Sequence, residues 1–342
     1  MPAGAAATEP PEERGLARDG VRLLVAWPGG LRHAVFADIG DFLAPGDLLV
    51  VNDSATLAAA VDGHRRGEPV TVHFSTGRPD GAWVVELRAP APATGPLRDA
   101  RPGDLVELPA GASITLLAAH PDPLAGRSRL WRGIVAVEGP VEAYLARHGR
   151  PITYGYVTGR WPLAAYQTVF AREPGSAEMP SAGRPFSTGL VTSLVSRGVL
   201  VAPVTLHAGV SSLEAGEPPQ PEPFRVPVPT ARLVQHVRRS GGRVVAVGTT
   251  VTRALETVAA PDGTVRPGTG WTDLVLGPDR PARVVTGLVT GWHEPGASHL
   301  LLLEAVAGAE LVRGAYAEAV RAGYRWHELG DSCLLLPEGM AS

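Results

Sequence analysis

The sequence predicts an α/β main domain interrupted by an inserted all-β domain, a small barrel. Apolar runs typical of parallel sheets, two of them followed closely by helical patterns, fill the C-terminal half of the chain. Short alternating apolar runs separated by Gly, Pro and Asp turns fill residues 61–137. Because α/β sequence flanks this β-rich stretch, we expect a discontinuous α/β domain (16–60 and 150–342), a barrel domain (61–149) and a disordered tail (1–15).

The composition is that of a folded protein without a bulk charge signature. The chain has 342 residues, 44% of them hydrophobic, and a formal net charge of -3. That charge argues against a strongly basic nucleic-acid or membrane binder and leaves room only for a local basic patch. Lysine is absent, so every fixed side-chain cation is an arginine.

The cysteine content and the N-terminus predict a cytoplasmic protein. A single cysteine, Cys333, excludes an internal disulfide framework and a cysteine-based zinc site, and fits a reducing compartment. The N-terminal stretch lacks the basic start and apolar core of a signal peptide, and no apolar run reaches the roughly 18 residues of a membrane span. We therefore expect no membrane partner.

The first strong element is "GDLLVVND", residues 46–53, a buried strand that presents Asn52 and Asp53 at its exit. After the β-rich stretch, "GPVEAYLARHG" predicts a short helix between Pro140 and Gly149. The stretch 214–230 is so rich in proline that we expect a surface loop there.

Two helices stand out in the C-terminal half. The helix after Thr250 places Val251, Ala254, Leu255 and Val258 on one buried face. A second helix carries Leu311, Ala315 and Ala319 and ends near Gly323.

"GGRVVAVGTTVTRALE" is the most informative motif for chemistry. A strand that runs through Gly-Thr-Thr into a helix leaves backbone N–H groups and the hydroxyls of Thr249 and Thr250 at a helix N-terminus, where anions and sugar hydroxyls bind. Simple helix capping explains the motif equally well, since it is neither a Walker A loop nor GxGxxG. Arg253 and Glu256 fit a solvated i,i+3 pair by default.

"TGWHEPGASH" offers histidines without metal-ligand spacing. His293 and His299 are six residues apart across a proline, whereas two ligands on one helical face need a step of three or four, and HExxH is absent. We expect no metal. The helix that follows can be capped by Ser298, which leaves His293 as the residue in need of another explanation.

Other polar residues are weak signals one at a time. Tyr166 and Gln167 lie in the apolar "YQTVFA", and His207 ends the strand "VTLHAG", but both patterns also fit ordinary structural contacts. A covalent hydrolase is unsupported, because there is no GxSxG elbow and Cys333 lies in an apolar run.

Taken in order, several blocks resemble the S-adenosylmethionine:tRNA ribosyltransferase-isomerase family of queuosine biosynthesis. The resemblance covers about residues 18 to 336, and its specificity comes from the ordered set. The blocks are "RLLV", "GDLLVVND", "YQTVFA", "GSAEMPSAGRPFS", "VTLHAG", "GGRVVAVGTTVTRALE", "HEPGASHLLLLEAVAGAELVRGAY" and "YRWHELGDSCLL".

The resemblance implies a transferase-isomerase that uses S-adenosylmethionine as co-substrate, without a further cofactor. The family transfers the ribosyl part of S-adenosylmethionine to a 7-aminomethyl-7-deazaguanine base in tRNA, where it becomes an epoxycyclopentanediol as adenine and methionine leave. The family fold, an α/β domain with an inserted barrel, agrees with the order of elements above. The oligomeric state stays open.

The resemblance also implies site residues. A histidine or carboxylate suits removal of the proton that the sulfonium activates, because its pKa can be tuned toward the working pH. The catalytic candidates are His207, His293 and Asp331, with the proton acceptor not assigned among them. The substrate-binding candidates are Asn52, Asp53, Tyr166, Gln167, Thr249, Thr250, Arg253, Tyr324 and Arg325.

The chain departs from the family pattern at several positions. "NDSATL" lacks the arginine of the usual Asn-Asp-Thr-Arg run, and Arg184 and Pro185 replace a Leu-His pair. The usual His-Ser-Glu block near the proline-rich loop reads "QPE", and Gly291 stands for an asparagine. Two alternatives therefore stay open: a paralogue that binds S-adenosylmethionine or another nucleoside and uses a different acceptor, and a non-catalytic binding protein.

Overall fold

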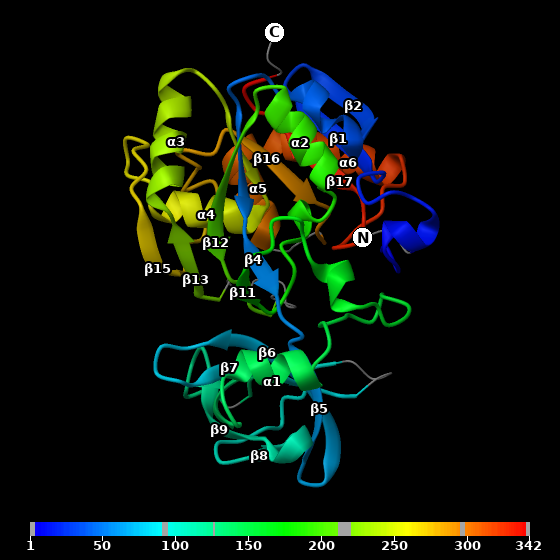
Figure 1. Cartoon of the computed structure of the whole chain (residues 1–342), viewed down its shortest axis with the longest axis vertical. Coiled ribbons are helices and arrows are strands. Elements are labelled where there is room, and N and C mark those ends of the chain that lie inside the picture. The colour runs from blue at the N-terminus through cyan, green and yellow to red at the C-terminus, as the bar shows by residue number, and fades with distance from the viewer. Residues whose placement is uncertain (1–3, 91–94, 126, 211–219, 295–297, 340–342) are drawn as a thin grey trace.

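A computed structural model describes residues 4–90, 95–125, 127–210, 220–294 and 298–339 of the chain. Its main domain is built on a nine-stranded mixed sheet, and a closed barrel lies at one end of that domain (Figure 1). None of the helices in these ranges is long and apolar enough to cross a membrane.

The central sheet has a parallel middle and antiparallel margins. Strands β12, β3, β14 and β16 pair in parallel, and β17 and β1 form a second parallel pair that joins β16 in antiparallel fashion. Polar side chains that follow the four parallel strands therefore gather at one edge of the sheet. The order is β15 (Gly268–Thr272), β13 (Glu222–Val226), β12 (Leu200–Leu206), β3 (Leu48–Asn52), β14 (Val244–Val247), β16 (Gly287–Gly291), β17 (Ser332–Leu335), β1 (Arg22–Trp27) and β2 (Gly30–Val35).

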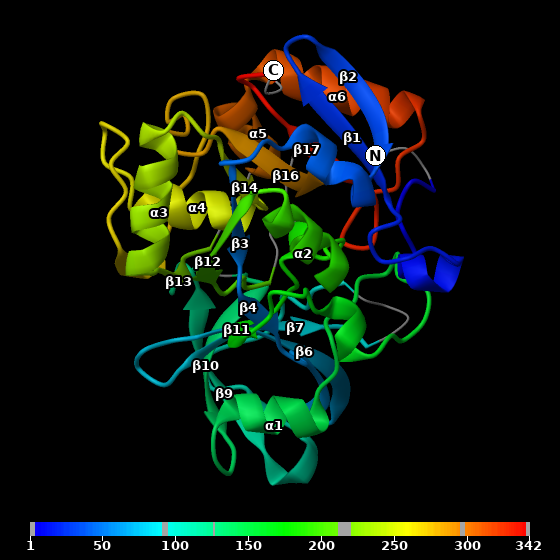
Figure 2. The ribbon, with the colours of Figure 1, turned by 45° about the horizontal axis from the view of Figure 1, so that its top comes forward.

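Helices cover both faces of this sheet, which explains why β3 and β14 are apolar at nearly every position. One face packs against α3 (Val228–Arg239), α4 (Thr249–Thr257), α5 (Ser298–Ala307) and α6 (Ala309–Arg321). The other packs against the 3₁₀ helix η2 (Phe36–Phe42) and α2 (Thr188–Ser196). Figure 2 shows α3 and the β1–β2 hairpin at opposite ends of the domain.

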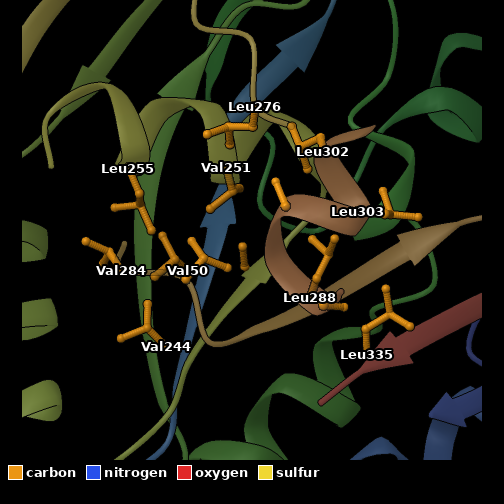
Figure 3. Close-up of a cluster of buried hydrophobic side chains, with 14 of the residues drawn as sticks. Val50, Val244, Val251, Leu255, Leu276, Val284, Leu288, Leu302, Leu303 and Leu335 are labelled. Carbon is orange, nitrogen blue, oxygen red and sulfur yellow. The ribbon is translucent and has the colours of Figure 1, made fainter. Parts of the chain in front are cut away.

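The core under α4 confirms the amphipathic pattern read from the sequence. Val251 and Leu255 point from α4 toward Val50 and Val244 of the sheet, and all four side chains are inaccessible to solvent (Figure 3). Each fully buried side chain of this size contributes about 1.5 to 3 kcal/mol. The N-terminus of α4 is thus held at a fixed place above the ends of β3 and β14.

The barrel closes completely, so it has no exposed strand edges. Its order is β10 (Leu130–Ala136), β7 (Trp83–Arg88), β6 (Glu68–Gly77), β5 (Ala60–Arg65), β8 (Leu105–Glu107) and β9 (Ser113–His120), and α1 (Val141–His148) follows it. A separate apolar cluster that includes Phe74, Trp83 and Trp131 fills its interior.

The segments that connect the barrel to the main domain are held together by backbone pairing. On the way in, β4 (Ser54–Thr56) pairs in parallel with β11 (Glu173–Ser176), which follows the barrel in the chain and runs in the same direction as β4. Closer to the barrel, the backbone groups of Ala60 and Arg150 exchange two hydrogen bonds of 2.9 Å. The two connections are therefore side by side.

The structure corrects two expectations. Within the predicted disordered tail 1–15, residues 4–15 are placed: Ala6 bridges Trp326, Ala7 is fully buried, and Pro11–Arg14 form η1. The predicted surface loop 214–230 contains β13 and the start of α3, while 211–219 lie outside the described residues. Proline fits both elements, because α3 carries its proline in the first turn and β13 makes only two paired contacts with β12.

Candidate active site

A cavity of about 560 Å³ opens where the parallel strands end, between the sheet domain and the segments that flank the barrel. Its wall includes Thr249, Thr250 and Arg253 of α4, His293 after β16, and Tyr166. The structure thus brings together five of the twelve residues that the sequence nominated. The carboxyl ends of parallel strands are where α/β proteins usually bind ligands.

Gly248 shapes the wall at the start of α4. Its φ of 99° is costly for other residues, and a Cβ there would lie 3.3 Å from the Cβ of Ala182. The next residues, Thr249 and Thr250, are partly exposed in the first turn of α4 and line the cavity. Their hydroxyls and the free N–H groups of that turn form a polar platform suited to hydroxyls or an anion.

Arg253 is a buried anchor and not half of a solvated pair with Glu256. Its guanidinium forms an ion pair with Glu222 and donates to the carbonyl oxygens of Leu274 and Thr272 at 3.1 and 3.0 Å. Glu256 is 1% exposed and accepts the backbone N–H groups of residues 283–285 at 2.8 to 3.1 Å. Arg253 therefore fixes the wall around β13 and β15.

His293 lies on the cavity wall as a neutral imidazole. Its ring stacks on His299 at 4.5 Å, and its Nε2 lies 3.3 Å from the hydroxyl oxygen of Thr290. Burial first, and then the neighbouring His299 and His327, hold the pKa of His293 well below its usual range. A neutral imidazole nitrogen is the form that accepts a proton.

Two tyrosine–glutamate pairs form the wall on the barrel side. Tyr154 donates its hydroxyl to Glu178, and Tyr156 donates to Glu328 over 2.5 Å. The two tyrosine rings stack at 6.1 Å, and Tyr156 also stacks on His327 at 4.2 Å. Sequence reasoning missed these tyrosines, although the alternation "TYGY" directly after the predicted helix α1 is a visible signal.

A strained turn carries Glu328 to this wall. His327 has a φ of 71°, which is uncommon for a residue with a side chain. The Gly330 N–H closes the turn on the His327 carbonyl at 3.0 Å. Nothing local in the sequence relates Glu328 to Tyr156, because the two residues are 172 positions apart.

Asp331 lies behind this turn and does not line the cavity. It accepts the backbone N–H groups of Arg22 and Arg325 at 3.0 and 2.8 Å and is 5% exposed. Burial raises its pKa. The carboxylate nominated as catalytic therefore ties β1 to the loop that carries His327 and Glu328.

His207 also lies behind the wall. Its Nδ1 is 2.7 Å from the Ser54 hydroxyl, and burial lowers its pKa. A Cβ on Gly175 would lie 2.5 Å from that nitrogen, so only glycine fits against the ring. The cavity is lined instead by the next two residues, Ala208 and Gly209.

Asn52 and Asp53 hold strand ends together. The Asn52 amide bonds both backbone groups of Leu206 and reaches the Thr250 hydroxyl at 3.3 Å. Asp53 accepts the Thr205 hydroxyl at 2.6 Å. Asn52 therefore positions Thr250 without lining the cavity.

The remaining nominated residues lie further out. Gln167 clamps both backbone groups of Thr56 at 2.8 and 2.9 Å. Tyr324 is buried under the Arg22 guanidinium, which lies 3.9 Å from the ring centre, and the side chain of Arg325 is exposed.

Arg184, which departs from the family pattern, also lies outside the cavity wall. It is 2% exposed, and its guanidinium donates to the Ala165 carbonyl at 3.0 Å and to Glu12 at 2.9 Å. It thereby joins η1 to the segment that carries Tyr166. No cluster of three or more His, Cys, Asp or Glu side chains suited to a metal ion occurs in the described part of the chain.

Comparison with known proteins agrees with this architecture. A family model described as "Queuosine biosynthesis protein" matches residues 1–335. The S-adenosylmethionine:tRNA ribosyltransferase-isomerase of Symbiobacterium thermophilum is 36% identical over 93% of this chain and 94% of its own. That of Moorella thermoacetica is 34% identical over 98% and 97%.

A solved structure extends the agreement to the fold. The crystal structure of S-adenosylmethionine tRNA ribosyltransferase from Thermotoga maritima matches 98% of both chains, with a TM-score of 0.54 and 27% identity. The α/β domain and the inserted barrel of this chain match the fold of that structure. The chain therefore belongs to the queuosine biosynthesis protein family, the family of the S-adenosylmethionine:tRNA ribosyltransferase-isomerases.

Proposed function

We propose that the protein transfers and isomerises the ribosyl part of S-adenosylmethionine onto a 7-aminomethyl-7-deazaguanine base in tRNA. One observation carries the proposal: a single cavity joins the α4 N-terminus, with its two threonine hydroxyls, to a partly buried histidine whose pKa is lowered. The first suits the hydroxyls of an adenosyl group, and the second suits proton removal. We place the reaction in the cytoplasm, with S-adenosylmethionine as co-substrate and no further cofactor.

The proposed chemistry begins with a proton on the carbon beside the sulfonium. His293 accepts that proton on the in-plane lone pair of a ring nitrogen, while the hydroxyl groups of Thr290 and Tyr316 hold the residue in place. Two bonds of the ribose break, one to adenine and one to the methionine sulfur. New bonds form to the acceptor amine and within the carbocycle. Adenine leaves with one of the two protons released from the carbon and the amine, methionine leaves with the former sulfonium sulfur as its neutral thioether, and the other proton passes to solvent. His207 and Asp331 support this site from behind as positioning residues.

The proposed tRNA partner calls for cations outside the cavity. Arg66 and Arg147 are exposed on the barrel and on α1, and Arg66 pairs with Asp104 at 2.7 Å, whereas Arg65 is buried against Asp99 and Asp104. Phosphate contacts from such arginines predict that tRNA affinity falls steeply with added salt.

The test uses the full chain, labelled S-adenosylmethionine and tRNA that carries the deazaguanine. Adenine and methionine should appear in equal amounts, and the tRNA should gain the mass of the carbocycle. His293→Ala should remove the turnover while the fold, followed by circular dichroism, is kept. Absence of adenine release with the wild-type protein would reject the proposal.

A second candidate is a relative that uses a different acceptor. The observation that favours it is the Arg184-Pro185 pair, which stands where the family has Leu-His: Pro185 takes the place of the histidine, and Arg184 points away from the cavity toward Glu12. Adenine release that proceeds equally well without the modified tRNA, in the presence of another amine, would select this candidate.

A further inference from the structure

Several buried carboxylates in this protein are paired with arginine. Glu86 contacts Arg88 and Arg129 at 3.0 and 2.8 Å, and Asp47 contacts Arg243 at 2.5 Å. In the cavity itself, Glu222 pairs with Arg253. Such pairing is expected, because an uncompensated charge in a low-dielectric interior costs several kcal/mol.

Glu328 lines the cavity without such an arginine among the described residues. Its carboxylate accepts the Tyr156 hydroxyl at 2.5 Å, and it forms no ion pair with any residue that the structure describes. A phenol donor satisfies one lone pair but supplies no charge. Burial raises the pKa of Glu328, as expected for a carboxylate that lacks a counter-charge.

A second, independent feature marks the same corner. Tyr166 lines the cavity and is 3% exposed, yet its hydroxyl has no hydrogen-bond partner among the described residues. Glu328 lies close enough to raise the pKa of Tyr166, after burial, to about 12. A buried hydroxyl without a partner costs about 1 to 3 kcal/mol, so its retention in a cavity points to a ligand.

Tyr166 is held firmly in this orientation. Its carbonyl accepts the Thr56 hydroxyl at 2.8 Å, and the carbonyl of the preceding Ala165 accepts from Arg184. On the other side, the turn closed by Gly330 fixes Glu328. The unpaired carboxylate and the free hydroxyl are thus preorganised on opposite elements of one wall.

We propose that Glu328 and Tyr166 form a subsite for an organic cation, which supplies the missing counter-charge to Glu328 and takes the hydroxyl of Tyr166 as a further contact. This inference rests on the proposed function for the choice of cation. Two sources share the chemistry: the sulfonium of the donor and the aminomethyl group of the acceptor base, which is protonated near neutral pH.

Two matched ligand pairs separate these sources in calorimetric titrations of the full chain. S-adenosylmethionine is compared with S-adenosylhomocysteine, whose sulfur is neutral. Free 7-aminomethyl-7-deazaguanine is compared with the same base carrying a neutral 7-hydroxymethyl group. The wild-type protein should prefer the cationic member of one pair, and Glu328→Gln should remove that preference by weakening the cation about ten- to a hundredfold.

Tyr166→Phe should weaken the same cationic ligand less, and it tests the site even if Glu328→Gln folds poorly, because its hydroxyl bonds no described residue. Glu310→Gln, an exposed carboxylate on α6, is the control for net charge and should leave all affinities unchanged. Loss of preference in the first ligand pair assigns the sulfonium, and loss in the second assigns the amine.

The inference is overturned if Glu328→Gln and Tyr166→Phe bind the cationic and neutral members as the wild type does, or if the wild type prefers neither cation. These titrations need no turnover, so their failure is distinct from that of the proposed function, which is decided by adenine release from wild-type protein with tRNA.

Discussion

Glu86 in the barrel is a fully buried carboxylate and Glu328 in the cavity wall is a partly buried one, and their surroundings are opposite. Two arginines flank Glu86 and, with the nearby His73, hold its pKa at about 2 despite complete burial. Glu328 has a tyrosine in place of a cation, and burial raises its pKa. A compensated carboxylate serves the fold, whereas an uncompensated one at a cavity wall is available to a ligand.

The largest expected effect is on the barrel. Glu86→Gln removes the counter-charge that Arg88 and Arg129 share, so we expect the free energy of unfolding to fall by about 3 to 5 kcal/mol. Urea denaturation measures the change. The control is Glu107→Gln, an exposed carboxylate on β8, which should stay within about 0.5 kcal/mol of the wild type. A loss under about 1 kcal/mol at Glu86 would show that the cluster is not a stabilising unit.

Lowering the pH should remove the stabilising contribution of Glu86. Because the folded pKa of Glu86 lies below the usual 4.5, its stabilising effect is present above that value and is lost as the pH falls toward about 2. The shift corresponds to about 3 kcal/mol. The free energy of unfolding, measured at several pH values in this range, should fall more steeply with decreasing pH for the wild type than for Glu86→Gln. Equal slopes would contradict the prediction.

Glu328 should behave with the opposite sign. Its raised pKa means that ionisation disfavours the folded state, a penalty that is absent below the usual 4.5 and grows as the pH rises through the folded pKa. Glu328→Gln should therefore be as stable as the wild type or more stable near neutral pH, by no more than about 1 kcal/mol. The comparison with Glu86 fails if Glu328→Gln is strongly destabilised at neutral pH.

The smallest expected effect is that of Tyr166→Phe. The hydroxyl has no partner among the described residues, so its removal should change the free energy of unfolding by less than about 0.5 kcal/mol. Tyr156→Phe makes a sharp contrast, because it removes the hydroxyl that Glu328 accepts and should cost about 1 to 2 kcal/mol. Equal effects of the two substitutions would mean that Tyr166 has an unseen partner.

The sequence was most informative where periodicity and local motifs carry the structure. The apolar run that ends at Asn52 became β3, and the Gly-Thr-Thr motif became the start of α4 on the cavity wall. The proline-rich stretch was wrongly predicted to be a loop. Its prolines are compatible with β13, and the sequence does not show which backbone groups of that strand bond to its neighbours.

The candidate site was only partly predictable. His293 and Tyr166 line the cavity, but His207 and Asp331 lie one layer behind it, and motifs do not tell which side of a strand end faces a ligand. The pairing of Tyr156 with Glu328 joins distant segments and is fixed by the barrel connection. No local pattern encodes such a contact.

The hydrogen bonds between the segments that enter and leave the barrel bear on whether the barrel can be removed or replaced. Since Ala60 and Arg150 are paired as in an antiparallel ladder, the chain ends left by removing the barrel would be only about 5 Å apart. A tight hairpin would suffice to reseal the main domain, and a foreign module with adjacent termini would fit the same joint. The barrel is therefore an exchangeable part, and the sheet domain, with its own hydrophobic core, could keep its architecture while this part is replaced.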